Sequence, residues 1–250
     1  RSGHIDDMTR MALSKMAHIH FPATKKAFER LIKLGEEKRR IYLVGAPQLD
    51  DINYDKIQKE KYIKIKNNLI NLKENYFVIL QHPVFKNQKK YYKLYKKTLL
   101  ATQKFNCKKY IIYPNYDPGY KSIIKLLNRL KDKNFKIFKH INRQEFLSLV
   151  SHSKALIGNS SSGLLESASL RIGVVNIGDR QNLRERDINV FDSKYETKDI
   201  YNKIKLAIKI KKHIKKIKNI HGDGNSSKRI YKILKKIKID ENLLNKNTTY

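Results

Sequence analysis

The chain has 250 residues, of which 40% are hydrophobic, and its 55 lysines and arginines against 23 aspartates and glutamates give a formal net charge of +32. This hydrophobic content excludes an intrinsically disordered chain, and no apolar run approaches the ~20 residues that span a bilayer, so we expect no membrane partner. The single cysteine, Cys107, excludes a disulfide framework and favours a reducing, cytoplasmic location.

The positive charge allows two interpretations. A basic surface can bind a polyanion such as nucleic acid, whereas a lysine-rich composition can equally produce a solvated lysine surface. The lysines are spread over the whole chain, and no nucleic-acid-binding motif accompanies them. Their densest run, at 203–220, has apolar residues at helical spacing, which is typical of a helix docked by its apolar face. We therefore expect no nucleic-acid partner, and a basic nucleic-acid-binding protein is the alternative from another class.

The first predicted element is an amphipathic helix within residues 4–21. Its polar and apolar faces are formed respectively by Asp7, Arg10, Ser14 and His18 and by Met8, Ala12, Met16 and Ile19. The apolar face is predicted to pack on a sheet of its own domain, and to be exposed where that sheet is missing. The polar face either borders a site or is solvated. Residues 40–47 then predict a strand that ends in a turn.

From residue 75 onward, short apolar runs alternate with segments of helical periodicity. Five strands are predicted, at 76–83, 109–115, 135–141, 155–159 and 173–178. Helices are predicted near 89–105, at 118–132, at 143–153 and directly after the fourth strand. This alternation predicts an α/β fold with a parallel sheet covered on both faces. The last residues, 242–250, are predicted to fray.

The loop after the fourth strand, Gly158 to Gly163, has the sequence GNSSSG. Unpaired N–H groups and a partial positive charge make a helix N-terminus attractive to anions. Glycine lets a ligand approach the backbone, and serine hydroxyls add donors. One serine would be enough for an N-cap, so the loop predicts a phosphate site at Ser160 and Ser161, with a plain capped turn as the alternative.

Polar side chains also stand at other strand ends, where ligands bind in sheets of this kind. His82 and Asn115 end the first two strands, and Arg180 follows the fifth, where it could pair with a diphosphate. Glu166 lies further along the serine-led helix, and its carboxylate could accept hydrogen bonds from a ribose diol.

Six stretches follow one another in order: GHIDDMTRMALSKMAHIHFPAT, RIYLVGAP, QHPV, YPNYDPG, GNSSSGLLESASLRIGVVNIGDRQNLRERDINV and GDGNSSKRI. Together they resemble the UDP-N-acetylglucosamine 2-epimerases. The NSSSG loop resembles the hydrolysing branch, which forms N-acetylmannosamine for sialic-acid-type sugars, because the non-hydrolysing branch typically has DSGG there.

The resemblance implies two Rossmann-like domains facing each other across a cleft, the glycosyltransferase-B arrangement. Residues 1–57 would be the end of a truncated N-terminal domain, 58–222 the C-terminal nucleotide-binding domain, and 223–250 a C-terminal helix and tail. The family's HIxGGE stretch, which stands just before IDD, is absent, so we expect a fragment that lacks most of the first domain. A homo-oligomer is expected at full length.

The resemblance also implies a set of site residues, with no metal and no cofactor. The implied UDP-binding residues are His82, Asn115, Ile141 (a backbone contact to uracil), Ser160 and Ser161 (diphosphate), Glu166 (ribose) and Arg180. The residues implied to border the sugar and its chemistry are Asp6, Asp7, Arg10, His18 and His20. Met11 stands where the family commonly has a histidine, and its thioether cannot transfer protons.

The implied reaction begins when a base removes the C2 proton of the sugar while UDP leaves C1, which gives a glycal. Water then adds at C1, and a proton returns to C2 from the opposite face. Such chemistry needs an acid and a base with separated pKa values, and charge stabilisation on the departing diphosphate. A non-hydrolysing epimerase or a glycosyltransferase of the same fold is the alternative.

Overall fold

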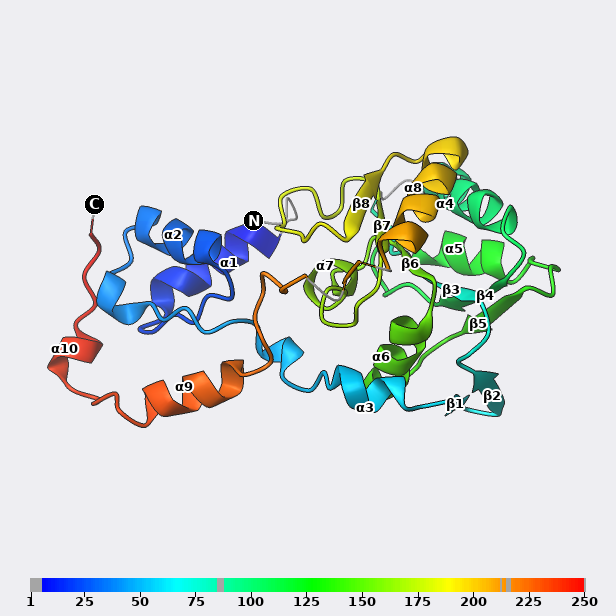
Figure 1. Ribbon diagram of the computed structural model, residues 1–250. Coiled ribbons are helices and arrows are strands. Elements are labelled where there is room, and N and C mark those ends of the chain that lie inside the picture. The colour runs from blue at the N-terminus through cyan, green and yellow to red at the C-terminus, as the bar shows by residue number, and fades with distance from the viewer. Residues whose placement is uncertain (1–5, 85–87, 212, 215–216, 250) are drawn as a thin grey trace. The chain divides into compact units, whose positions relative to one another are not determined.

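The computed structural model describes residues 6–84, 88–211, 213–214 and 217–249. The chain divides into two compact units (Figure 1): unit 1 is Arg1–Ile52 with Lys218–Tyr250, and unit 2 is Asn53–Ile217. Residues 218–250 therefore belong to the same unit as the N-terminal segment, whereas the sequence-based division ended the second domain at 222 and set 223–250 apart.

Unit 2 is built on a six-stranded parallel sheet in the order β5-β4-β3-β6-β7-β8. The strands are β3 (Tyr76–Leu80), β4 (Lys108–Ile112), β5 (Phe135–Phe138), β6 (Ala155–Gly158), β7 (Val174–Ile177) and β8 (Val190–Ser193). The predicted parallel sheet is thus confirmed, with the first five strands where the apolar runs lie. The sixth, β8, was not predicted, because its four residues carry an exposed aspartate, Asp192, and give no continuous apolar run.

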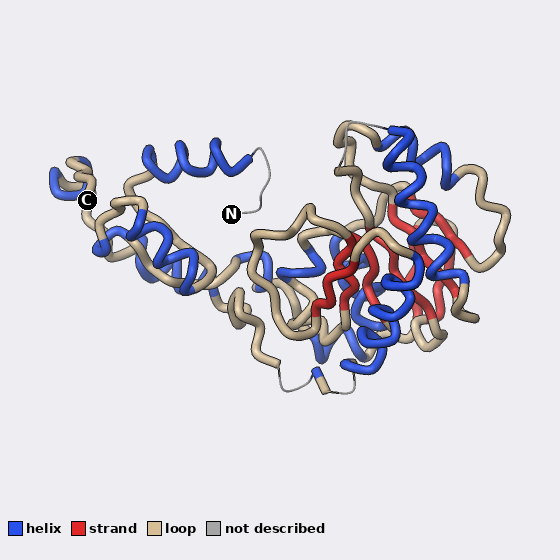
Figure 2. Tube along the Cα trace, turned by 90° about the horizontal axis from the view of Figure 1, so that it is seen from above, coloured by secondary structure: helices blue, strands red, loops and turns tan. Residues whose placement is uncertain are grey.

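Helices cover both faces of this sheet (Figure 2). They are α4 (Gln88–Gln103), α5 (Tyr120–Leu127) and α8 (Thr197–Ile210) on one face, and α6 (Arg143–His152) and α7 (Ser162–Leu165) on the other. Successive strand residues point to opposite faces. Accordingly Phe77 and Ile79 join the main core with α4, α5 and α8, whereas the hydroxyl of Tyr76 donates to the Leu149 carbonyl of α6 at 2.9 Å.

A short segment precedes the sheet of unit 2. It consists of α3 (Tyr54–Gln58) and an antiparallel hairpin of β1 (Tyr62–Ile65) and β2 (Asn68–Asn71). This hairpin was not predicted, since lysines and asparagines interrupt its apolar pattern.

Unit 1 is mainly helical. Its elements are α1 (Asp6–Met16), α2 (Lys25–Lys33), the 3₁₀ turns η1 (Lys38–Arg40) and η2 (Pro47–Leu49), α9 (Ser226–Leu234) and α10 (Glu241–Leu244). The predicted strand at 40–47 is wrong: only an isolated parallel bridge joins Ile41 to His20. A ladder needs a continuous row of hydrogen bonds to one neighbouring strand, whereas the backbone N–H groups of Tyr42, Val44 and Ala46 donate to the separate carbonyls of His20, Pro22 and His221.

The apolar face of α1 is exposed, which is the outcome expected where the sheet that it would pack on is missing. Met8 and Met16 are 75% and 74% exposed. The helix is instead held at its carboxyl end, where the Lys246 ammonium donates to the carbonyls of Ser14, Lys15 and Ala17 at 2.7–3.0 Å.

The C-terminal tail is ordered, so the predicted fraying of 242–250 is wrong for the described residues up to 249. Thr248 bridges to Glu36, and the Thr249 N–H donates to the Gly35 carbonyl at 2.9 Å. The buried guanidinium of Arg40 donates to the carbonyls of Asn242, Leu243 and Asn245 at the end of α10. These bonds join residues about 200 positions apart, which no local pattern could predict.

Candidate functional site

The candidate site lies where the order of the sheet reverses. Strands β4 and β5 extend from β3 in one direction, and β7 and β8 extend from β6 in the other. At such a switch point the connections after the two central strands leave to opposite faces, so a crevice opens at the carboxyl ends. His82 follows β3, and Asn159 follows β6 directly. The two loops that border the crevice are therefore those carrying QHP and GNSSSG.

Gly158 allows these two loops to approach each other. Its φ is +145°, and a Cβ at this position would lie 2.0 Å from the Leu80 carbonyl oxygen. A side chain is thus excluded by the neighbouring backbone, which is the physical reason for glycine here. Asn159, which comes next, is 1% exposed. Its Oδ1 accepts from the His82 N–H at 2.6 Å, and its Nδ2 donates to the His82 carbonyl at 3.0 Å.

The imidazole of His82 is held in one protonation state. Its Nδ1 accepts the backbone N–H of Asn115 at 3.1 Å, so the neutral ring carries its proton on Nε2. Burial, followed by the positive charge of Arg180, lowers the pKa of His82 to about 4, although Asp117 acts in the opposite direction. The ring is therefore uncharged near neutral pH and offers a single N–H donor.

Arg180 is the positively charged residue beside this ring. Its guanidinium donates at 3.4 Å both to the Asn159 carbonyl and to Asp117 Oδ2. Its Nε is buried and has no hydrogen-bond partner among the described residues, and the same is true of Asn115 Oδ1. Unsatisfied buried polar atoms are costly, so a ligand that pairs with them would be favoured. A charged donor suits an anion.

The serine loop differs from its prediction in one respect. The helix α7 has only four residues, and Ser161 at its N-cap position makes no side-chain cap. Instead Ser160 Oγ accepts from the Ser162 N–H at 3.4 Å and from the Ser162 hydroxyl at 2.9 Å. So short a helix has little macrodipole, because the dipole sums over aligned peptides. Arg180, rather than the end of α7, is therefore the group that best suits an anion.

Glu166 pairs with a residue that sequence reasoning missed. Its side chain is 8% exposed, and its Oε1 accepts from Arg143 at 2.8 Å. Arg143 is the first residue of α6, whose start is fixed by a reciprocal capping box of Asn142 and Glu145. Ile141 is partly buried in the loop just before it. The signal that could have found Arg143 is its place after the carboxyl end of β5, next to the predicted Ile141.

The residues predicted in unit 1 do not form one cluster. Arg10, Met11 and His20 line a pocket of about 790 Å³ between α1 and α2. His20 also contacts a buried carboxylate, because its Nε2 lies 2.9 Å from Glu36 Oε2. Burial lowers the pKa of His20. His18 is exposed, with its ring 3.3 Å from the Leu244 carbonyl. Asp6 and Asp7 begin α1, but their side chains lie outside the described residues.

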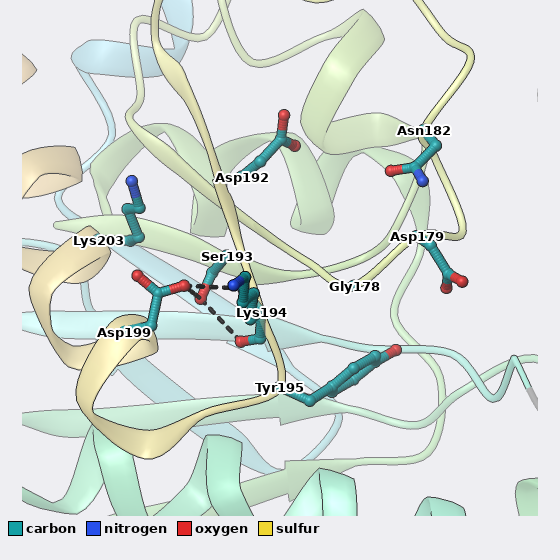
Figure 3. A pocket seen from close by; sticks show the side chains of 9 residues that line it. All are labelled: Gly178, Asp179, Asn182, Asp192, Ser193, Lys194, Tyr195, Asp199 and Lys203. Atoms are coloured by element: carbon teal, nitrogen blue, oxygen red, sulfur yellow. Dashed lines mark hydrogen bonds between the residues drawn. The ribbon is translucent and has the colours of Figure 1, made fainter.

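A second pocket, of about 620 Å³, opens after β7 and β8 (Figure 3). Gly178, Asp179 and Asn182 line it on one side, and residues of β8 and α8 line it on the other. There Asp199 accepts from the Ser193 hydroxyl and the Lys194 N–H at 3.0 and 2.8 Å. None of the residues predicted to bind UDP lines this pocket.

Among the described residues, no group of three or more His, Cys, Asp and Glu side chains could hold a metal ion. No helix in the described ranges has the length and apolar character needed to cross a membrane.

Comparison with known sequences gives consistent matches. The family model described as UDP-N-acetylglucosamine 2-epimerase matches residues 1–235. A Legionella pneumophila UDP-N,N'-diacetylbacillosamine 2-epimerase (hydrolyzing) is 35% identical, covering 100% of this chain and 66% of the relative. A Neisseria meningitidis UDP-N-acetylglucosamine 2-epimerase is 33% identical over 84% of this chain and 55% of the relative. A Campylobacter jejuni GDP/UDP-N,N'-diacetylbacillosamine 2-epimerase (hydrolyzing) is 35% identical over 79% and 52%. The chain thus spans about half to two thirds of the length of these relatives.

Solved structures show the same fold. The N. meningitidis UDP-GlcNAc 2-epimerase bound to UDP-GlcNAc matches with a TM-score of 0.69 at 20% identity, covering 90% of this chain and 63% of that one. A Methanocaldococcus jannaschii UDP-GlcNAc 2-epimerase in complex with UDP-GlcNAc and UDP matches with a TM-score of 0.67 at 18% identity, covering 86% and 60%. The expected fold class, Rossmann-like domains of the glycosyltransferase-B type, is confirmed.

Proposed function

Because the chain belongs to the UDP-N-acetylglucosamine 2-epimerase family, we propose that the full-length protein is a hydrolysing epimerase. It inverts C2 of a UDP-linked 2-acetamido sugar and releases UDP and the free sugar. The observation that carries this proposal is the pair of donors at the switch point. Arg180 has a buried Nε that lacks a partner within the described ranges, and it lies beside a neutral His82 that presents one N–H. Together they suit a diphosphate that gains negative charge as it leaves.

The roles proposed for the other nucleotide residues follow from their places around the crevice. Asn115 and Ile141, after β4 and β5, are proposed to contact the nucleoside. Ser160 and Ser161 supply hydroxyl donors to the diphosphate, and Glu166, which is paired with Arg143, accepts from the ribose diol.

For the sugar, the proposal uses unit 1. Arg10 and His20 border a pocket and are proposed to face the sugar. Asp6, Asp7 and His18 stay predictions as further acid/base candidates. In the proposed reaction a base takes the C2 proton as UDP departs from C1. Water and a proton then add to the glycal, which yields the 2-epimer.

Two sugars are candidates. UDP-N-acetylglucosamine would give N-acetylmannosamine, a precursor of sialic-acid-type sugars. UDP-N,N'-diacetylbacillosamine is the second candidate, since two relatives at 35% identity carry that substrate and the word hydrolyzing in their names. The two differ in the sugar and share the nucleotide, so the UDP site of unit 2 serves both.

The test uses the protein expressed from its complete reading frame, with each UDP-sugar supplied in heavy water. UDP is quantified by chromatography, and the sugar product is identified by NMR. We expect free UDP together with a free 2-epimer that carries deuterium at C2. A product that remains linked to UDP would instead establish a non-hydrolysing epimerase. If neither UDP-sugar is consumed, the proposed function is wrong.

A further inference from the structure

Asn159 has no role in the proposed reaction, but its side chain holds the backbone of His82. Both polar atoms of its amide bond the peptide groups on either side of the His82 Cα, at 2.6 and 3.0 Å. The ladder between β3 and β6 ends at the pair Leu80 and Gly158. The Asn159 side chain therefore replaces two backbone hydrogen bonds just where the two strands separate.

A buried polar network of Tyr91, Gln81 and Thr98 also holds the His82 carbonyl. The hydroxyl of Tyr91 also donates to the His82 carbonyl. Gln81 Nε2 lies 3.3 Å from that hydroxyl, and Gln81 Oε1 accepts from Thr98 at 2.8 Å. Gln81 and Thr98 are fully buried. Networks of this kind specify one arrangement of a core because every alternative leaves polar groups unpaired.

The backbone oxygen of Asn159 also contributes. It accepts from Gln181 Nε2 at 2.9 Å and from the Arg180 guanidinium at 3.4 Å. One residue thus holds His82 through its side chain and Arg180 through its carbonyl. These are the two donors that meet at the switch point.

We propose that Asn159 is the positioning residue of this site: it fixes the His82 backbone so that Nδ1 of the ring meets the Asn115 N–H and Nε2–H is left as a donor to the nucleotide. The fixed ring geometry is a property of the free protein. Its use in ligand binding rests on the proposed function. The two Asn159 hydrogen bonds fix the His82 backbone, so that only the side-chain torsions of His82 can still move the ring. The Asn115 N–H then selects one tautomer of that ring.

The first test needs no variant. The histidine rings of the protein are labelled with ¹⁵N, and the His82 signals are identified by their loss in His82→Gln. In the ligand-free protein at neutral pH, we expect Nδ1 to show the chemical shift of an unprotonated ring nitrogen and Nε2 that of a protonated one. A His82 ring protonated on Nδ1 would overturn the proposal outright.

The second test compares Asn159→Ala with Asn189→Ala. Asn189 is also a fully buried asparagine, and it bonds Ser167 and the Ile172 carbonyl at 2.9 and 2.7 Å, away from His82. Both variants lose buried hydrogen bonds, so both should unfold at lower urea concentration. Only Asn159→Ala should show a mixture of His82 tautomers and bind UDP at least about tenfold more weakly by calorimetry, the size of effect typical when a supporting partner is removed.

The outcomes separate this inference from the proposed function. If Asn159→Ala is folded, keeps the tautomer and binds UDP like the unmodified protein, Asn159 is only structural and the inference is wrong. If Asn189→Ala produces the same changes at His82, the effect is general loosening, and the inference is again wrong. If the unmodified protein shows the expected tautomer but does not bind UDP, the proposed role of His82 in nucleotide binding is wrong. The tautomer measured in Asn159→Ala then still decides whether Asn159 positions the ring.

Discussion

At the residue scale, the site combines charges that constrain one another. Burial, followed by the charge of the Arg180 guanidinium, lowers the pKa of His82, and Asp117 Oδ2 lies 3.4 Å from the Arg180 guanidinium. Glu166 is similarly paired with Arg143. A ligand that enters between these groups meets donors already oriented, so little reorganisation is required on binding.

The first prediction is that Glu166→Gln weakens UDP binding by roughly 1–3 kcal/mol, the cost of losing a charge-assisted hydrogen bond. Calorimetric titration with UDP measures it. Arg143→Gln is the companion variant, because it removes the ion pair but leaves the carboxylate for the ribose, and we expect it to weaken binding less. Equal affinities for Glu166→Gln and the unmodified chain would remove Glu166 from the ribose site.

The second prediction concerns pH. The pKa of His82 is about 4 in the folded chain against 6.5 for an unperturbed histidine. The unfolded chain therefore binds the proton first as the pH falls. The stability that His82 contributes is present above about pH 6.5 and is lost progressively toward pH 4. Between about pH 7 and pH 5, the free energy of unfolding should fall by about 1–2 kcal/mol more in the unmodified chain than in His82→Gln. Parallel urea titrations measure the difference, and identical pH dependence would contradict a neutral buried ring.

At the element scale, the loop from β6 to α7 decides whether the crevice can form. Gly158 is the last residue of β6 and Gly163 is the second residue of α7, and the two differ in their surroundings. A Cβ on Gly158 would meet backbone at 2.0 Å, whereas a Cβ on Gly163 would meet a methyl group of Val174 at 3.0 Å, and of the two only Gly158 has a positive φ.

The third prediction is that Gly158→Ala destabilises unit 2 by roughly 3 kcal/mol or more, from backbone strain and a clash that cannot relax. Gly163→Ala should cost clearly less, because its contact is with one methyl group at 3.0 Å rather than with backbone at 2.0 Å, and its backbone carries no left-handed strain. Urea unfolding of both variants tests this. Similar midpoints for the two would mean that the close approach of β6 to β3 is not what requires glycine.

Another element, α1, depends on the tail. Lys246 is 11% exposed and contacts both the carboxyl end of α1 and the fully buried Glu36. The fourth prediction is that Lys246→Met accelerates hydrogen exchange of α1 amides, since the buried carboxylate of Glu36 keeps Lys15 but loses its second lysine, and three carbonyls lose their donor. Lys228→Met, an exposed lysine on α9, is the control for the loss of one charge. Unchanged exchange in Lys246→Met would show that α1 is held by other contacts.

At the scale of the whole molecule, the residues proposed for nucleotide binding and those proposed for the sugar lie in different units. Every residue proposed to contact UDP lies within residues 53–217, whereas the residues proposed for the sugar lie in unit 1. Catalysis requires acid, base and leaving group to be placed around one carbon, and misplacement costs orders of magnitude in rate.

The fifth prediction follows from this division. Residues 53–217, expressed alone, should bind UDP with an affinity close to that of the 250-residue chain and should release no UDP from a UDP-sugar. Calorimetry and a coupled UDP-release assay measure the two properties. Loss of binding in the isolated unit would mean that unit 1 contributes to the nucleotide site, and turnover by it would place the acid and base in unit 2.

The sequence by itself determined the parallel sheet and the family, and it supplied the residues that we propose for the nucleotide site. Strands β3 to β7 are short segments rich in apolar residues, and their order, together with motifs such as GNSSSG, is a property of the linear chain. Only the tertiary structure decided which of these residues meet. Asn159 lies 77 positions from His82, Arg143 lies 23 from Glu166, and Lys246 lies more than 200 from Glu36. Local periodicity reports how a segment presents its side chains, whereas such pairs depend on register between strands and on where the chain returns. For the same reason residues 40–47, with the pattern of a strand, form none, because a strand exists only where another segment completes its hydrogen bonds.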